Sequence, residues 1–156
     1  MSTSAVFASA FAFARCHRQV DSESASDNIF DLLKSYVSIR DFATKAKPEN
    51  FYHGFLSGVF TNCFDFISDF KSNSESGDGY ADLIFKNKDG DTAVILELKI
   101  SKSDDDFEQD TNEALLQIEK KKYYEPFVKK VNIETIYCYG ISFYNKQCYI
   151  AGKKIK

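Results

Sequence analysis

The 156-residue chain is long enough for one globular domain that buries about two thirds of its unfolded surface, and too short for a second full domain. Hydrophobic residues make up 44% of it, which predicts an ordered chain rather than a low-complexity one. The net charge of −3 gives no overall attraction to nucleic acid, so any such binding requires a local basic patch.

Hydropathy and cysteine spacing exclude several classes of protein. No apolar stretch approaches the ~20 residues of a membrane-spanning helix, so we expect no membrane association. The cysteines lack CxxC spacing and accompanying histidines, which favours reduced thiols in an intracellular protein over a zinc or redox motif. The four are Cys16, Cys63, Cys138 and Cys148. Residues 1–18 are rich in Ser, Ala and Phe and lack acids, which suits an organellar presequence; a family-specific helix or a frayed tail is the alternative.

Residues 1–47 are predicted to form a helical N-terminal extension. The polar segment Ser22–Asn28 indicates a linker, and the apolar residues after it recur at helical spacing. These are Ile29, Leu32, Leu33 and Tyr36.

A second helix is predicted to begin at Pro48, which suits a first helical turn. Its apolar stripe runs from Phe51 to Phe64, and the opposite face carries Glu49 and His53. These two residues are four apart and can touch. Either they are a capping acid beside a solvated histidine, or they contribute to a functional site.

Three strands are predicted to follow, over Asp69–Glu75, Tyr80–Lys86 and Thr92–Ile100. The Gly77-Asp78-Gly79 segment favours a hairpin turn over a phosphate-binding loop, because no helix start follows it. Asn87–Asp91 is also a turn sequence, which makes the second and third strands antiparallel neighbours.

The third of these strands carries charge inside an apolar run. Alternation places Glu97 and Lys99 on one face, and Asp82 lies on the adjacent strand. The run AVILELKI is typical of a central strand covered on both faces, where a buried charge is costly unless an ion or a function balances it. The alternative is a salt bridge between Glu97 and Lys99 on an exposed edge strand.

The last elements are a helix over Thr111–Tyr124, a strand region over Asn132–Phe143, and a short strand over Gln147–Ala151 before a loose basic tail. The acidic run Asp104–Asp106 is predicted to be a solvated loop rather than a metal site, since the EF-hand spacing is missing. Gln117 lies on the helix face that carries Ala114 and Ile118. The element order predicts an α/β fold with an αβββαβ core, in which a mixed central sheet is flanked by helices and the helix makes a right-handed crossover.

Carboxylates on two neighbouring strands suit Mg²⁺, which takes a few carboxylates and several waters. Such an ion lowers the pKa of a bound water and neutralises charge on a phosphoryl oxygen. The ammonium of Lys99 can hold the attacking water or stabilise the phosphate. The combination fits phosphodiester hydrolysis.

Asp82, the Glu97-Leu98-Lys99 triplet and the following helix with Gln117 resemble the PD-(D/E)XK nuclease superfamily, with Ala81-Asp82 in place of Pro-Asp. Five segments more narrowly resemble the small nuclease-like domain found C-terminal to AAA-type ATPase domains. They are Pro48–His53 (PENFYH), Ser72–Gly79 (SNSESGDG), Ile95–Lys99 (ILELK), Ala114–Ile118 (ALLQI) and Gly140–Phe143 (GISF). This resemblance implies a restriction-endonuclease-like fold and a nuclease-like domain over residues 48–156.

The resemblance also implies a role for each site residue. Asp82 and Glu97 would bind Mg²⁺ or Mn²⁺, Lys99 would position the water, and Gln117 would orient Lys99 or a phosphate. The supporting residues would be Glu49, His53 and Glu75. The expected partner is nucleic acid, DNA above all, and an ATPase acting in trans is a further expectation.

Two features depart from that family pattern. Ser74 and Tyr80 stand where the family often has basic residues, and the ATPase domain is missing. A Mg²⁺-dependent nuclease is the leading hypothesis. A catalytically inactive nuclease-fold module that binds a protein or nucleic acid is the alternative.

Overall fold

A computed structural model describes residues 22–38 and 47–156, with side chains from Ala25 onward. The N-terminal presequence prediction and Cys16 lie outside these residues. The elements in chain order are α2 (Ser22–Tyr36), α3 (Pro48–Thr61), β1 (Ile67–Ser76), β2 (Gly79–Asn87), β3 (Thr92–Ile100), η2 (Asp104–Asp106), α4 (Phe107–Lys120), α5 (Glu125–Val128), β4 (Thr135–Tyr144) and β5 (Gln147–Lys154).

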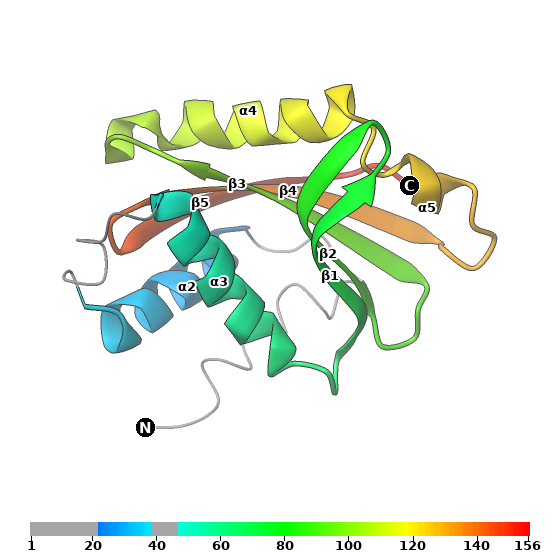
Figure 1. Cartoon of the computed structure of the whole chain (residues 1–156), viewed down its shortest axis with the longest axis horizontal. Helices are drawn as coiled ribbons and strands as arrows, with labels where there is room; N and C mark the ends of the chain where they lie inside the picture. Colours follow the sequence, from blue (N-terminus) through cyan, green and yellow to red (C-terminus); the bar gives the residue numbers. More distant parts are fainter. Residues whose placement is uncertain (1–21, 39–46) are drawn as a thin grey trace.

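The five strands form one mixed sheet in the order β1-β2-β3-β4-β5 (Figure 1). The β3–β4 pair is parallel and its strands are joined through α4, while the other neighbouring pairs are antiparallel. This is the predicted mixed sheet, with β3 at its centre. The alternative of an edge strand for the Glu97–Lys99 segment is therefore wrong.

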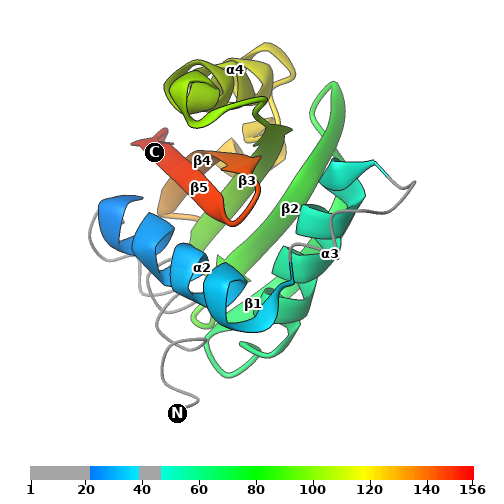
Figure 2. The ribbon, with the colours of Figure 1, turned by 90° about the vertical axis from the view of Figure 1, so that its left-hand side faces the viewer.

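Helices cover both faces of the sheet, with α4 on one side and α2 and α3 on the other (Figure 2). Side chains of β3 alternate between two apolar clusters, as predicted. Val94, Leu96 and Leu98 belong to the cluster that includes α2 and α3, whereas Ala93 and Ile95 belong to the cluster with Ile118 of α4. Glu97 and Lys99 continue the second series, so they face α4.

A glycine and a hydrogen bond set how closely α4 approaches this face. A side chain at Gly140, the partner of Glu97 on β4, would lie 2.4 Å from the Thr111 carbonyl oxygen. The hydroxyls of Thr111 and Ser142 form a buried hydrogen bond of 2.7 Å. The absence of a side chain at Gly140 therefore lets the helix pack directly over Glu97.

Several predicted boundaries were wrong, including the start of β4, which is Thr135 rather than Asn132. Ser22–Asn28 is helical rather than a linker, because Ala25 is buried in the core as the first turns of α2 pack along β5. Helix α4 spans Phe107–Lys120 instead of Thr111–Tyr124. Residues 152–154 are not a loose tail, because β5 pairs with β4 as far as Lys154.

Cys63, Cys138 and Cys148 are free thiols, in agreement with the prediction for those three. Among the helices of the described residues, none has both the length and the apolar character needed to cross a bilayer.

Candidate active site

The site begins where β2 separates from β3. The two strands pair from Lys86 opposite Ala93 to Leu83 opposite Leu96, and Asp82 and Glu97 come next. There the Asp82 carboxylate Oδ2 accepts the Leu98 N–H at 2.7 Å. A side chain thus takes a ladder hydrogen bond of the central strand, which fixes the Asp82 carboxylate beside β3.

Glu97 is the buried acid of the site, with 3% of its surface exposed. Its Oε1 accepts a short hydrogen bond from the Gln117 side-chain nitrogen. Its Oε2 is also buried and makes no hydrogen bond of normal geometry within the described part of the chain, although the Asp82 backbone N–H lies near enough to the carboxyl to lower its pKa. A buried carboxylate oxygen without a partner is costly, so this atom is free to bind a cation.

Gln117 joins the acid to the base. Its Oε1 accepts a 2.6 Å hydrogen bond from Lys99 Nζ, while its Nε2 donates to Glu97. The ion pairs found among residues 25–38 and 47–156 are Lys86–Asp69 and Lys153–Glu119, so Lys99 and Glu97 are bridged by an amide instead of forming a direct ion pair.

Tyr123 completes this network and was not predicted. Gln117 Nε2 lies 3.2 Å from the Tyr123 hydroxyl. The Tyr123 carbonyl accepts a hydrogen bond from the Ser76 hydroxyl at 2.6 Å. A Cβ atom at Gly79 would lie 3.2 Å from the Tyr123 ring, so the hairpin packs closely on this ring. Tyr123 therefore connects the β1–β2 hairpin to the amide that holds Lys99. The sequence offers only one signal for it, an aromatic residue just after the helix that carries Gln117.

Burial determines the electrostatics of the two acids. It raises the pKa of Glu97 from an ordinary 4.5 to about 8, and the neighbouring charge of Asp82 adds to the effect. Burial also raises the pKa of Asp82, opposed by the Leu98 N–H. Two buried acids with raised pKa values, one of which resists ionisation beside the other, form a site that a cation would stabilise.

The three supporting residues occupy different positions. The exposed Glu49 of α3 is close enough to raise the pKa of both Asp82 and Glu97. His53 Nε2 lies 3.1 Å from the Asp82 backbone oxygen and 3.3 Å from the Ser72 hydroxyl, so α3 holds the strand that carries Asp82. Glu75 pairs with Tyr80 across the hairpin, and its exposed side chain has no hydrogen bond to the site among the described contacts.

The site offers few side-chain donors to a divalent cation. The described residues contain no group of three or more His, Cys, Asp or Glu side chains positioned for a metal. Two carboxylates are present, and one of them has a buried, unpartnered oxygen. Mg²⁺ prefers a few carboxylate ligands, with waters in its remaining coordination positions, so the residues fit such an ion.

Comparison with known proteins identifies the family. A family model described as the PD-(D/E)XK nuclease superfamily matches residues 47–153, more than half of the chain. No curated protein and no solved structure matches the chain. The matched range contains the whole sheet to within one residue of its end, α4, and all the site residues described above. The chain belongs to the PD-(D/E)XK nuclease superfamily.

Proposed function

We propose that this protein is a nuclease that hydrolyses phosphodiester bonds, in DNA above all, with Mg²⁺ or Mn²⁺ as its cofactor. The observation that carries the proposal is the buried, unpartnered Oε2 of Glu97, close to Asp82 and to a lysine held by Gln117. A purely structural role gives no reason to leave that oxygen without a partner at the centre of the sheet.

Each residue has a distinct task in this reaction. Asp82 and Glu97 would hold the cation, which would supply a water of lowered pKa and neutralise charge on the phosphoryl oxygens. Lys99 directs its ammonium toward the water or the developing phosphate charge. Gln117 fixes the ammonium through its Oε1, and Tyr123 fixes Gln117.

The test is cleavage by the purified chain of labelled single- and double-stranded DNA and RNA, with Mg²⁺, with Mn²⁺ and with EDTA. We expect metal-dependent cleavage that Lys99→Ala lowers by about 10²- to 10³-fold, the usual cost of removing one such electrostatic group. Lys102→Ala, an exposed lysine beyond β3, is the matched control and should cut normally. Absence of cleavage under every condition, or equal cleavage by Lys99→Ala, would refute the nuclease.

The alternative is an inactive nuclease-fold module that binds a protein or nucleic acid. It is favoured by the net charge of −3 and by the uncharged Ser74 and Tyr80. A calorimetric titration with Mn²⁺ separates the two functions. Heat that disappears in Asp82→Asn supports the nuclease, whereas no binding in the wild type supports the inactive module. An ATPase partner in trans stays a prediction from the resemblance.

A further inference from the structure

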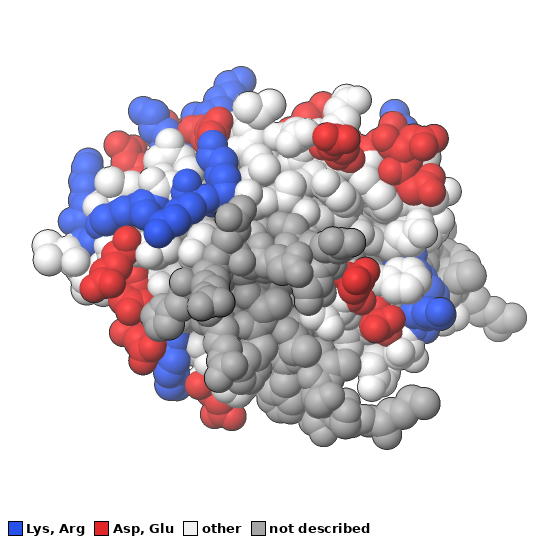
Figure 3. Space-filling model, turned by 180° about the vertical axis from the view of Figure 1, so that it is seen from behind, with Lys and Arg blue, Asp and Glu red and all other residues white. Residues whose placement is uncertain are grey.

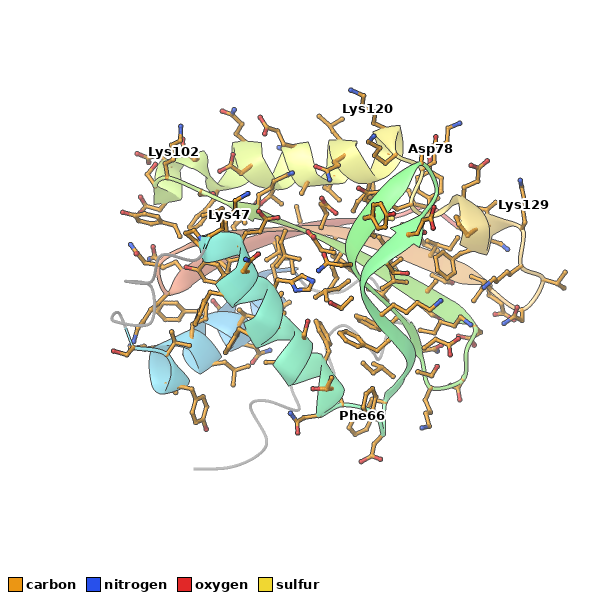
Figure 4. All side chains as sticks on the ribbon, viewed as in Figure 1. Lys47, Phe66, Asp78, Lys102, Lys120 and Lys129 are labelled. Atoms are coloured by element: carbon orange, nitrogen blue, oxygen red, sulfur yellow. The ribbon has the colours of Figure 1, made fainter. Side chains whose placement is uncertain are left out.

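The tip of the β1–β2 hairpin lies against the end of α4, beside the site. The Asp78 N–H donates to the Lys121 carbonyl at 2.7 Å, and a side chain at Gly77 would lie 2.3 Å from the Lys122 carbonyl oxygen. Figure 4 shows Asp78 and Lys120 together at this end of α4, with Lys102 at the other end. The hairpin and the helix end therefore form one rim.

An exposed aromatic ring stands on this rim. Tyr80 is 66% exposed, and alternation along β2 places it on the same side of the strand as Asp82. An exposed tyrosine two residues from a metal-binding acid has no packing role to explain it. Its uncovered ring offers a surface on which a flat group can stack.

The helix side of the rim supplies apolar surface and positive charge. A pocket along one flank of α4 is lined by Leu116, Gln117, Lys120 and Lys121, with Glu113 at its far end. Leu116 is 60% exposed there, and Gln117 is the residue that holds Lys99. The pocket therefore joins the basic end of the helix to Gln117, the residue that contacts Glu97 and Lys99.

Charge is polarised along α4. Acids gather at its beginning, in Asp104–Asp106, Glu108 and Asp110, and lysines gather at its end, in Lys120–Lys122. Figure 3 shows a similar separation from behind, with the largest group of Lys and Arg side chains at one end of the face and a group of acids at the other. A polyanion would approach the site from the lysine end.

We propose that this rim binds single-stranded nucleic acid, with a base stacked on Tyr80 and backbone phosphates contacted by Lys120 and Lys121. This inference rests on the proposed function, since it assigns a substrate class to the same site. A tyrosine ring can stack only on a base whose face is uncovered, which a duplex interior does not offer. Stacking does not require positive charge at position 80, so the rim does not depend on a basic residue there.

The test is fluorescence anisotropy of the full chain with a labelled oligothymidine and with a matched duplex, in EDTA so that no strand is cut. Removing one base-stacking ring should weaken single-strand binding by about 5- to 150-fold in Tyr80→Ala. Tyr80→Phe keeps the ring and should bind within about twofold of the wild type, and duplex binding should change less than single-strand binding. Tyr149→Ala is the matched control, because it removes an exposed ring from β5, the edge strand opposite β1.

A salt titration tests the two lysines separately. Each phosphate contact to a single strand adds about 0.7 to the slope of the logarithm of affinity against that of salt concentration. Lys120→Ala and Lys121→Ala should each lower the slope by about that amount, and Lys102→Ala should leave it unchanged. Unchanged slopes in both rim variants would remove the lysines from the inference.

The outcomes separate this inference from the nuclease proposal. Binding that depends on Tyr80 in a chain that never cuts would support the rim and refute the nuclease. Cleavage with normal single-strand binding by Tyr80→Ala would refute the rim and leave the nuclease standing. Failure of the wild type to bind any oligonucleotide would refute nucleic-acid binding by the rim. Binding of a protein ligand at the rim instead would also refute it.

Discussion

Glu97 shows how a single residue can be costly to the fold and useful to the site. Its side chain is buried against α4, where burial raises its pKa to about 8, and one of its oxygens lacks a partner. Near neutral pH the acid therefore retains much of its proton until a cation replaces it.

The first prediction concerns that exchange. Because the proton on Glu97 competes with the metal, the apparent affinity for Mn²⁺ should rise by up to about tenfold per pH unit below pH 8 and level off above it. Calorimetry in two buffers of different ionisation enthalpy should detect the released proton at pH 7. The exposed acid Asp78 supplies the control Asp78→Asn, which should behave as wild type. An affinity that is constant from pH 6 to 8 would contradict the raised pKa.

The second prediction concerns Tyr123, whose hydroxyl contacts the site through Gln117. Tyr123→Phe keeps the ring between hairpin and helix but removes the hydroxyl. We expect a loss of about 10- to 100-fold in kcat, as is typical for residues that orient a catalytic group, with little change in KM or in Mn²⁺ affinity. Tyr36→Phe, at an exposed tyrosine of α2, is the control. Parallel losses in metal affinity and thermal stability would mean that the hydroxyl acts on the fold instead.

At the scale of elements, the placement of α4 decides whether the site exists. The sheet supplies Glu97 and Lys99, but Gln117 reaches them only because α4 lies directly on β4 at Gly140. The helix is fixed laterally by the Thr111–Ser142 hydrogen bond. The distance between α4 and the sheet must therefore be kept for the Gln117 amide to bridge Glu97 and Lys99.

The third prediction tests this separation. In Gly140→Ala the new methyl group would lie 2.4 Å from the Thr111 carbonyl oxygen, so α4 must move outward. We expect a loss of about 1–3 kcal/mol in unfolding free energy, with a larger proportional loss of cleavage, because Gln117 moves with the helix. Gly54→Ala is the matched control, since open space surrounds that position in α3. It should be neutral or stabilising by up to about 1 kcal/mol in urea unfolding.

Sequence periodicity predicted the strands of the site because a period of two fixes the face of every residue once one is known. The bounds of β3 and the placement of Glu97 and Lys99 on one face were correct, and the structure adds that this face is covered by α4. The end of α4 could not be predicted. The Tyr123 N–H bonds the Ile118 carbonyl, the Lys122 N–H bonds that of Glu119, and Lys122 has a φ of +52°, which together form a Schellman cap without the usual glycine. That cap also brings the Tyr123 hydroxyl to Gln117, which is why sequence missed this contact.

Tertiary contacts explain why the start of α2 was missed. The start of α2 is polar in sequence and gives little periodic signal, yet Ala25 is fully buried in the cluster shared with α3 and the sheet. Burial of Ala25 and the packing of α2 along β5 outweigh the weak local preference of Ser22–Asn28.

At the scale of the whole molecule, the sheet separates two apolar clusters, and the site lies where β2 leaves β3. The fold must therefore tolerate an acid within its central, largely buried strand. That cost depends on pH, and a bound cation would reduce it, which links the chemistry of the site to the stability of the chain.

The last prediction measures this link. The pKa of Glu97 is about 8 in the folded state against 4.5 as the ordinary value, so between those pH values the unfolded chain releases a proton that the folded chain retains. The contribution of Glu97 to stability should then fall as pH rises through this window, by at most about 1.4 kcal/mol per pH unit, and be lost above pH 8. Glu97→Gln cannot ionise, so its advantage over the wild type in urea unfolding should grow from pH 5 to pH 8. Glu113→Gln, at an exposed acid of the same helix that carries Gln117, should show no such trend.

Saturating Mg²⁺ adds the decisive comparison at pH 8. It should stabilise the wild type and leave Glu97→Gln nearly unchanged, because the variant lacks the charge that holds the ion. The contrary outcome is a difference in unfolding free energy between wild type and Glu97→Gln that changes with neither pH nor Mg²⁺. It would show that Glu97 has no raised pKa in the fold and does not bind the ion.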